Sequence, residues 1–215
     1  MQKLDKDNWE RANLVEKYAD YVLPYVILSA DVDVTGLYRF AKKHEISFYC
    51  AMMHTAVRAA NEFRNLHYRM IDGEPYLCER LDPNFTHMAP GSEDFIVLHG
   101  EYCEDLMTFC KNTQEMMEKA EGDVDGDRIS YSGTPEVVYV SCIPWIKYTQ
   151  FIRTIDNAKT DNIPRLSWGK YEWDDKGRLK MPFSVQAHHA LADGYHVAIY
   201  MNRVQELLDE FEDEL

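Results

Sequence analysis

The chain has 215 residues, 46% of them hydrophobic, and this length fits one large domain over residues 1–215, with two small domains as the alternative. Its 37 acidic and 23 basic residues give a formal net charge of −14, which repels phosphate backbones and anionic lipids and so argues against nucleic-acid and membrane partners. The charged N-terminus and the lack of any run near the ~20 apolar residues of a membrane span predict a cytoplasmic protein.

Strands and helices alternate along the predicted fold. The periodic segments predict, in chain order, a strand over 25–34, a short helix from 35 or 36 toward 44, a helix over 48–63, a β-hairpin over 68–81, an amphipathic helix over 101–119, a loop over 120–133, strands over 137–143 and 179–187, and a closing helix after 194. Ser47 is typical of a helix N-cap, and Asp72-Gly73 favours the positive backbone angles of a tight turn. This order predicts an α/β or α+β sandwich, neither all-helical nor all-β.

Three imidazoles and one carboxylate fall within residues 188–196, which read HHALADGYH. Adjacent His188 and His189 on a strand would project to opposite faces, and no H-E-x-x-H pattern is present, so we predict no metal site. Histidines satisfied by hydrogen bonds in the core are the alternative interpretation. However, a strand that runs into His189 and a turn at Asp193-Gly194 would display one imidazole at a strand end, where it can act as a general base near neutral pH.

The segment HHALADGYH resembles the H-H-x-x-x-D-G-x-H signature of chloramphenicol acetyltransferases, and a shorter form recurs in dihydrolipoamide acyltransferases and peptide-synthetase condensation domains. Other motifs resemble the same family in the same order: Trp9-x-Arg11 with Tyr18, Phe48-Tyr49, the hairpin at 69–74, Ser141-x-x-Pro144-Trp145 and Gly169-Lys170-Tyr171. The resemblance covers nearly the whole chain. It implies a two-layer sandwich with a mixed β-sheet packed against helices, assembled as a homotrimer with each active site at a subunit interface.

The resemblance implies O-acetylation of a small-molecule alcohol by acetyl-CoA, with chloramphenicol as the first candidate acceptor and antibiotic inactivation as the purpose. His189 would be the general base that takes the proton of the acceptor hydroxyl, and Ser141 would donate a hydrogen bond to the tetrahedral oxyanion. Asp193 would pair with Arg11 as structural support, while a backbone contact would set the tautomer of His189. Ser167 matches a threonine that fixes a water near the transition state.

The resemblance also assigns the walls of the site. The CoA channel would include Tyr49, Trp145, Lys170 and Tyr171, and the acceptor pocket would include Tyr18, Tyr25, Phe151, Arg153 and Ile155. For the channel residues, a core aromatic or a solvated lysine is the alternative. If 151–155 is a strand, Phe151, Arg153 and Ile155 share one face, and a guanidinium replaces an aliphatic side chain of the family. A polar or anionic acceptor is therefore an alternative substrate, and a non-catalytic CoA-binding or scaffold trimer is a third possibility.

Overall fold

A mixed β-sheet lies at the centre of the structure, a computed structural model that describes residues 1–121, 133–155 and 161–212. The strands are β1 (Gln2–Lys3), β2 (Tyr25–Asp33), β3 (Tyr68–Ile71), β4 (Glu74–Leu77), β5 (Asp82–Met88), β6 (Phe95–His99), β7 (Val137–Ile143), β8 (Arg165–Gly169), β9 (Glu172–Trp173) and β10 (Leu179–His188). The helices are α1 (Ala12–Tyr18), α2 (Thr35–Lys43), α3 (Phe48–Glu62), α4 (Arg64–His67), α5 (Leu106–Glu121) and α6 (Gly194–Asp209), followed by a 3-10 turn, η1 (Glu210–Glu212).

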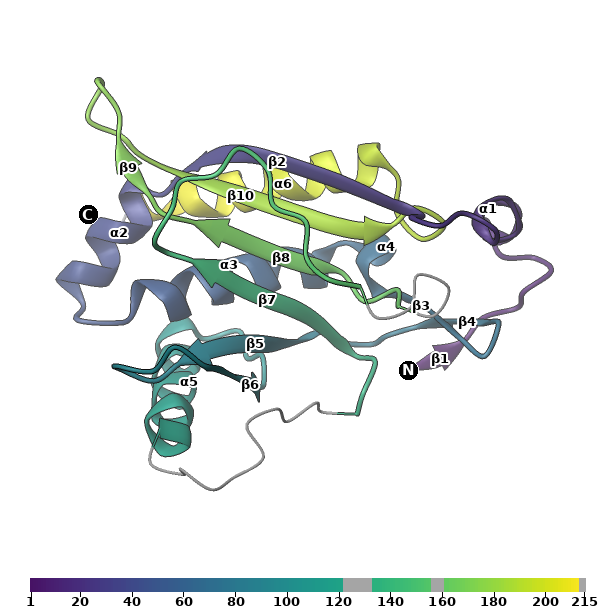
Figure 1. The fold of residues 1–215 in the computed structure, drawn as a ribbon, viewed down its shortest axis with the longest axis horizontal. Helices are drawn as coiled ribbons and strands as arrows, with labels where there is room; N and C mark the ends of the chain where they lie inside the picture. Colours follow the sequence, from purple (N-terminus) through teal and green to yellow (C-terminus); the bar gives the residue numbers. More distant parts are fainter. Residues whose placement is uncertain (122–132, 156–160, 213–215) are drawn as a thin grey trace.

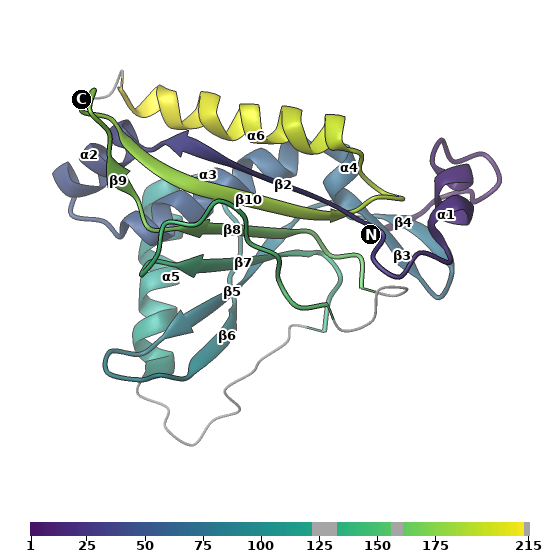
Figure 2. The same cartoon turned by 45° about the horizontal axis from the view of Figure 1, so that its top comes forward.

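The strand order of the main sheet is β2–β10–β8–β7–β5–β6, with β9 paired to β10, and a smaller sheet has the order β1–β4–β3 (Figure 1). The pairings β5–β7 and β7–β8 are parallel, whereas the other pairings of the main sheet are antiparallel. Helices α3 and α6 run along one face of this sheet (Figures 1 and 2). The predicted mixed sheet packed against helices is therefore present.

Strand β10 supplies the centre of the core because its side chains alternate between two faces. Met181, Phe183 and Val185 are fully buried on the face toward the helices, where Phe183 packs against Tyr200 of α6 at 6.3 Å between ring centroids. Burying an aliphatic or phenyl side chain of this size contributes about 1.5–3 kcal/mol. The opposite face of the same strand carries polar residues, so the two faces of the sheet differ in chemistry.

Most predicted elements are confirmed within one or two residues. Ser47 Oγ accepts a hydrogen bond from the backbone N–H of Cys50 at 3.3 Å, as expected of an N-cap. Asp72 and Gly73 have φ values of 51° and 78°, as the tight hairpin turn requires. No helix in the described ranges is long and apolar enough to cross a membrane.

Four predicted segments differ in the structure, and the first is the hairpin over 68–81, whose second strand, β4, ends at Leu77. Helix α5 begins at Leu106, not at residue 101, because Asp105 Oδ1 accepts a hydrogen bond from the backbone N–H of Thr108 at 2.8 Å and so ends the preceding loop. The helix extends to residue 121, so it includes the first two residues of the predicted loop 120–133. The part of that loop over 122–132 lies outside the described residues.

The segment 151–155 forms no strand, so the strand interpretation is wrong. It belongs to the chain that follows β7 and crosses the sheet face opposite to the helices (Figures 1 and 2). Its backbone is held by a side chain: the N–H of Arg153 donates to Gln186 Oε1 at 3.1 Å. Phe151, Arg153 and Ile155 are nonetheless half-buried, and the two residues between them are exposed.

Candidate active site

A cavity of about 1620 Å³ is lined by residues of the sheet face opposite to the helices, among them Asn84, Tyr139 and Ser141, and it reaches Phe48 and Tyr49 at the beginning of α3. The predicted site residues that line it are Tyr49, Ser141, Trp145, Phe151, Arg153, Ile155, Lys170 and Tyr171. The other predicted site residues, Arg11, Tyr18, Tyr25, Ser167, His189 and Asp193, do not line this cavity. Typical pockets for one small ligand measure about 300–1,000 Å³, so this cavity has room for two co-substrates.

Ser141 lies in the middle of β7 and is 8% exposed. Its Oγ is 3.1 Å from Thr86 Oγ1 on β5, and the backbone carbonyl of Thr86 accepts a hydrogen bond from the Tyr49 hydroxyl at 2.9 Å. Thr86 was not predicted as a site residue. The contact joins residues 55 positions apart, and only the parallel pairing of β5 with β7 brings them together, so no local sequence signal could have shown it.

Ser141 belongs to a row of hydroxyl side chains that crosses the sheet. In the strand register, Ser141 is opposite Ser167 on β8, and Ser167 is opposite Ser184 on β10. Ser184 Oγ is in turn 2.6 Å from Ser29 Oγ on β2. Ser167 is 2% exposed, beneath the crossing segment, whose Tyr148 hydroxyl donates to the Ser167 carbonyl at 3.0 Å. The structure thus places Ser167 beside Ser141 but below the cavity surface.

The residues predicted for the CoA channel lie near the carboxyl ends of β7 and β8, except Tyr49. Trp145 is 67% exposed, Tyr171 packs edge-on against Phe48 at 5.3 Å, and Lys170 Nζ is 3.5 Å from a carboxylate oxygen of Glu172. Tyr49 instead forms part of the cavity floor, and burial raises the pKa of its hydroxyl well above the usual value. Aromatic faces and a cation at an open cavity end suit an adenine and phosphates.

A second cluster forms around Arg11, which is 5% exposed. Its guanidinium donates to the backbone carbonyls of Ala190 at 2.7 Å and His189 at 3.0 Å, and to both carboxylate oxygens of Asp193 at 3.1 and 2.9 Å. The hydrogen bonds from Arg11 lower the pKa of Asp193 against the opposing effect of burial. The structure therefore brings together the two residues that the resemblance pairs, and the pair fixes the backbone on both sides of the turn.

His189 follows the last residue of β10, and its backbone N–H donates to the carbonyl of Pro24 at 2.8 Å. Its ring stacks on Tyr18 at 4.5 Å and 22°. Nδ1 lies 3.2 Å from Asp193 Oδ1, but it has no hydrogen-bond partner among the described residues. In this part of the chain, the backbone contact expected to set the tautomer of His189 is therefore not found at Nδ1, whose polar neighbour is the carboxylate of Asp193.

The other two histidines of the segment have structural contacts. His188 Nδ1 accepts from the backbone N–H of Ala190 at 3.2 Å, and its ring lies edge-on to Tyr25 at 5.4 Å. His196 Nδ1 accepts from the backbone N–H of Asp193 at 3.0 Å, and burial lowers its pKa, which favours the neutral ring. No three His, Cys, Asp or Glu side chains in the described part of the chain gather as a metal site would require.

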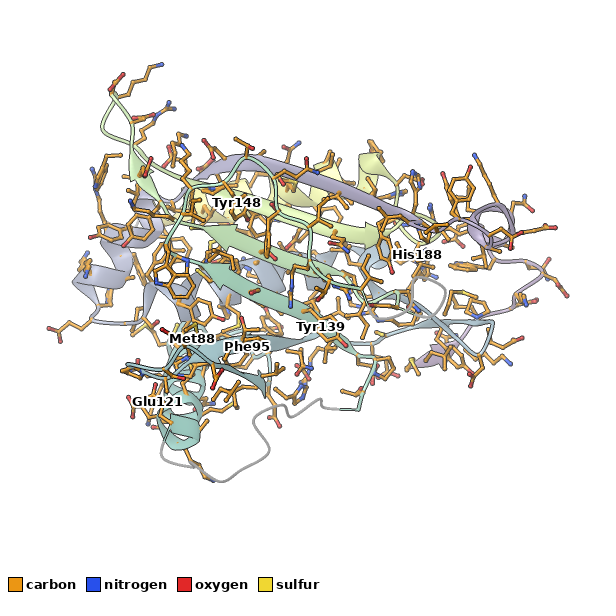
Figure 3. The ribbon with its side chains drawn as sticks, viewed as in Figure 1. Met88, Phe95, Glu121, Tyr139, Tyr148 and His188 are labelled. Carbon is orange, nitrogen blue, oxygen red and sulfur yellow. The ribbon has the colours of Figure 1, made fainter. Side chains whose placement is uncertain are left out.

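Tyr25 lies near the boundary between the Arg11 cluster and the cavity. Its hydroxyl donates to the backbone carbonyl of Asp161, a residue of the cavity wall, and burial raises the pKa of Tyr25 to about 12. Figure 3 shows Tyr139 and Tyr148 over the middle of the sheet and His188 near one end of β10, where the Arg11 cluster lies. Tyr25 is thus half-buried, with a neutral hydroxyl that already has a partner.

Ser141 and His189 are far apart within one chain. Ser184 is two strands away from Ser141, and His189 lies five residues beyond Ser184 along the chain. With about 3.3 Å per residue and about 4.8 Å per strand, the two residues are separated by roughly 20 Å. One acceptor molecule bound beside Ser141 is therefore out of reach of the imidazole of the same chain.

Comparisons with known proteins define the chain as an acyltransferase. A solved chloramphenicol acetyltransferase is 26% identical, with a TM-score of 0.88 over 96% of this chain and 99% of that one. Chloramphenicol acetyltransferase 3 of Escherichia coli is 31% identical over 95% of each chain, and the enzyme of Clostridium perfringens is 30% identical over 97% of this chain and 95% of its own. The family model for chloramphenicol acetyltransferase matches residues 1–205, so the chain belongs to the chloramphenicol acetyltransferase family.

Proposed function

We propose that residues 1–215 act as a single cytoplasmic acetyltransferase domain that transfers the acetyl group of acetyl-CoA to a hydroxyl of a small molecule, with chloramphenicol as the first candidate. The placement of Ser141 carries this proposal. Its hydroxyl lines a cavity. One end of this cavity is formed by Trp145, Tyr171 and Lys170, and one of its walls is formed by Phe151, Arg153 and Ile155. A thioester and an alcohol that enter from these two sides meet near Ser141.

The proposed chemistry needs one base and one oxyanion donor. The imidazole of His189 takes the proton of the acceptor hydroxyl as that oxygen attacks the thioester carbonyl, and the same imidazole then returns the proton to the departing CoA thiolate. Ser141 donates its hydroxyl hydrogen to the oxyanion of the tetrahedral intermediate. A preorganised donor of this kind contributes about 10²–10³ to kcat.

The distance of roughly 20 Å between these residues supports an active site that is shared between two copies of the chain. His189 of one copy would face the cavity and Ser141 of its neighbour. Apolar side chains are exposed on both regions: Val22 is 90% exposed near His189, and Trp145 and Ile146 are 67% and 57% exposed near the cavity. Exposed apolar groups favour burial in an interface, in line with the homotrimer that we propose.

Arg153 favours a second candidate function, acyl transfer to a polar or anionic alcohol. Its side chain is half-buried and lines the cavity between Phe151 and Ile155. A guanidinium in the acceptor wall places a cation and several N–H donors beside the acceptor, and these groups favour a polar or anionic ligand over a wholly apolar one. The two candidates share the chemistry and differ in the acceptor.

The direct test follows thiol release from acetyl-CoA by the purified protein, with chloramphenicol, with a panel of other alcohols and with none. Acceptor-dependent release by the wild type, with a loss of about 10²–10⁴ in His189→Ala, supports the proposal. His44→Ala is the matched control, because His44 is an exposed histidine at the end of α2 and should keep full activity. Full activity in His189→Ala would exclude the mechanism, and turnover of polar alcohols without chloramphenicol would select the second candidate.

A further inference from the structure

A second polar row crosses the sheet beside the hydroxyl row, and the proposed function does not use it. Its members face one another in the register, one from each of five neighbouring strands: His99 on β6, Asn84 on β5, Tyr139 on β7, Arg165 on β8 and Gln186 on β10. Along each strand, the member of this row is two residues away from the position of the hydroxyl row. Residues two apart on a strand point to the same side, so the two rows share a face of the sheet. Buried polar side chains are costly unless they are hydrogen-bonded, so the atoms of this row that have no partner need an explanation.

Among the described residues, three members of the row have a buried polar atom without a hydrogen-bond partner: Asn84 Oδ1, His99 Nδ1 and Gln186 Nε2. Of these three residues, Asn84 is the one that lines the cavity, and it is 3% exposed. His99 lies directly opposite on β6. Buried polar groups are nearly always paired in folded proteins, so orphaned atoms in one row are an unusual cost to stability. Such a cost is retained where a ligand supplies the missing partner.

The charges of this row are already compensated. Arg165 is 5% exposed, its guanidinium pairs with the carboxylate of Asp161, and it lies over the ring of Tyr139 at 5.4 Å from the centroid. The amide of Asn84 adds no charge and can present a lone pair to a donor. Asn84 therefore suits a neutral hydrogen-bonding group and gives no attraction to an anion.

The position of Asn84 assigns it to the acceptor side of the cavity. Its row lies about 7 Å from Ser141 toward the beginning of β7, since two strand residues rise by about that length. Trp145 and Lys170 lie beyond the other end of β7 and β8. If the reacting carbonyl lies beside Ser141, CoA extends from it toward Trp145 and Lys170, and Asn84 lies on the opposite side of Ser141.

We propose that Asn84 is a recognition subsite for the acceptor, whose Oδ1 accepts a hydrogen bond from an N–H or O–H group other than the hydroxyl that is acetylated. The substrate class is then a neutral alcohol with a second polar group, an amide or another hydroxyl, and not a simple apolar alcohol. This inference rests on the proposed function, because it assumes that the acceptor reacts beside Ser141.

The test compares two acceptors in wild type and in Asn84→Leu, which removes the amide at similar volume. Chloramphenicol carries an amide N–H and a second hydroxyl, whereas phenylpropanol carries neither. We expect the preference for chloramphenicol in kcat/KM to fall about fivefold or more in the variant, through its KM, with the KM of acetyl-CoA unchanged. The melting midpoint should not fall, because leucine removes an orphaned polar group. Asn112→Leu, an exposed site on α5, makes the same change away from the cavity and should leave the preference intact.

If Asn84→Leu keeps the preference for chloramphenicol over phenylpropanol, the inference is overturned. If its melting midpoint falls as well, Asn84 is assigned to a contact with a second copy instead. Asn84→Ala serves the same comparison if the leucine variant fails to fold. A wild type that turns over no alcohol would overturn the proposed function and this inference with it. Turnover with the same acceptor preference in wild type and variant would overturn the inference alone.

Discussion

At the scale of single residues, the proposed role of Ser141 assigns directions to two hydroxyl hydrogens. In the proposed mechanism Ser141 gives its hydrogen to the oxyanion and can only accept from its other neighbour, so Thr86 is the donor in the 3.1 Å contact with Ser141. Chains of hydrogen bonds polarise one another, so in this mechanism Thr86 makes Ser141 a better donor and holds its rotamer. Thr86 would then be a positioning residue, since it acts through Ser141.

Thr86→Val removes the hydroxyl at nearly constant volume, and we expect kcat to fall about tenfold with little change in either KM. Thr86→Ser should restore most of the rate. In a Ser141→Ala background the valine substitution should have no further effect, because its only route to the reaction is removed. Steady-state kinetics of the four variants measures this coupling, and independent losses that multiply would contradict it.

Asp193→Asn should lose activity and stability together, because Arg11 stays buried without its carboxylate. We expect a loss of about 3 kcal/mol in the free energy of unfolding, measured by denaturant titration. The folded-state pKa of Asp193 lies below its unfolded value, so the stabilisation is complete above about pH 4 and is lost as the pH falls through the lower folded value. The difference between wild type and variant should therefore vanish in strong acid. Lost turnover with an unchanged unfolding midpoint would contradict this structural role.

At the scale of elements, the crossing segment after β7 depends on Gly169 at the end of β8. A Cβ at this position would lie 2.8 Å from the carbonyl oxygen of Ile146 and 2.9 Å from Cδ1 of Tyr148. The absence of a side chain thus lets the segment that carries Trp145 lie close to the sheet. The shape of one end of the cavity follows from this contact.

Gly169→Ala should displace that segment and raise the KM of acetyl-CoA severalfold, at a cost of about 1–3 kcal/mol in stability. The KM of the acceptor should change less, because the backbone of the acceptor wall at Arg153 is held by its own hydrogen bond to Gln186. Initial-rate kinetics with each substrate varied in turn separates the two effects. Equal effects on both KM values would contradict a local displacement.

The elements predicted from the sequence are those with a clear period or a cap. The amphipathic helices and the alternating strand β10 are of this kind. Strand β8 was not predicted, because all five of its residues are buried and show no alternation. The cavity wall at 151–155 was considered as a strand, but the backbone N–H of Arg153 donates to a side chain and the segment joins no sheet. Local patterns do not report which long-range partner holds a segment.

At the scale of the whole molecule, the sequence motifs identified both halves of the proposed site but not their separation. His189 and Ser141 each stand in a recognisable motif, whereas the roughly 20 Å between them follows only from the strand order β10–β8–β7. Thr86 and Asn84 come from a strand that the periodicity did not predict. Sequence motifs therefore predicted the candidate catalytic residues, and the sheet register placed them relative to each other and to Thr86 and Asn84.

The stability of the whole chain should depend on two buried histidines. Burial lowers the pKa of His54 and of His67, so the unfolded chain takes up protons first as the pH falls below about 6.5. Their contribution is complete above that value and is lost on acidification. Acidification also reduces the repulsion within a chain of net charge −14, so the comparison requires a variant.

We expect the melting midpoint of His54→Gln, relative to that of wild type, to improve between pH 7.5 and 5.5. The glutamine amide can still donate to the carbonyls of Cys103 and Glu104, which His54 Nε2 contacts at 3.1 Å each, and it does not titrate. Calorimetry at several pH values gives the difference. A difference that is constant over this range would contradict the assignment.

The central claim is that His189 of one copy acts at the Ser141 cavity of another, and subunit mixing tests it most directly. His189→Ala and Ser141→Ala are each expected to be nearly inactive alone. Co-expressed in equal amounts in a cyclic trimer, they should assemble an intact His189 and Ser141 at about one site in four and recover about a quarter of the wild-type activity. No recovery in hybrids shown to contain both variants would place the whole site within one chain and contradict the account.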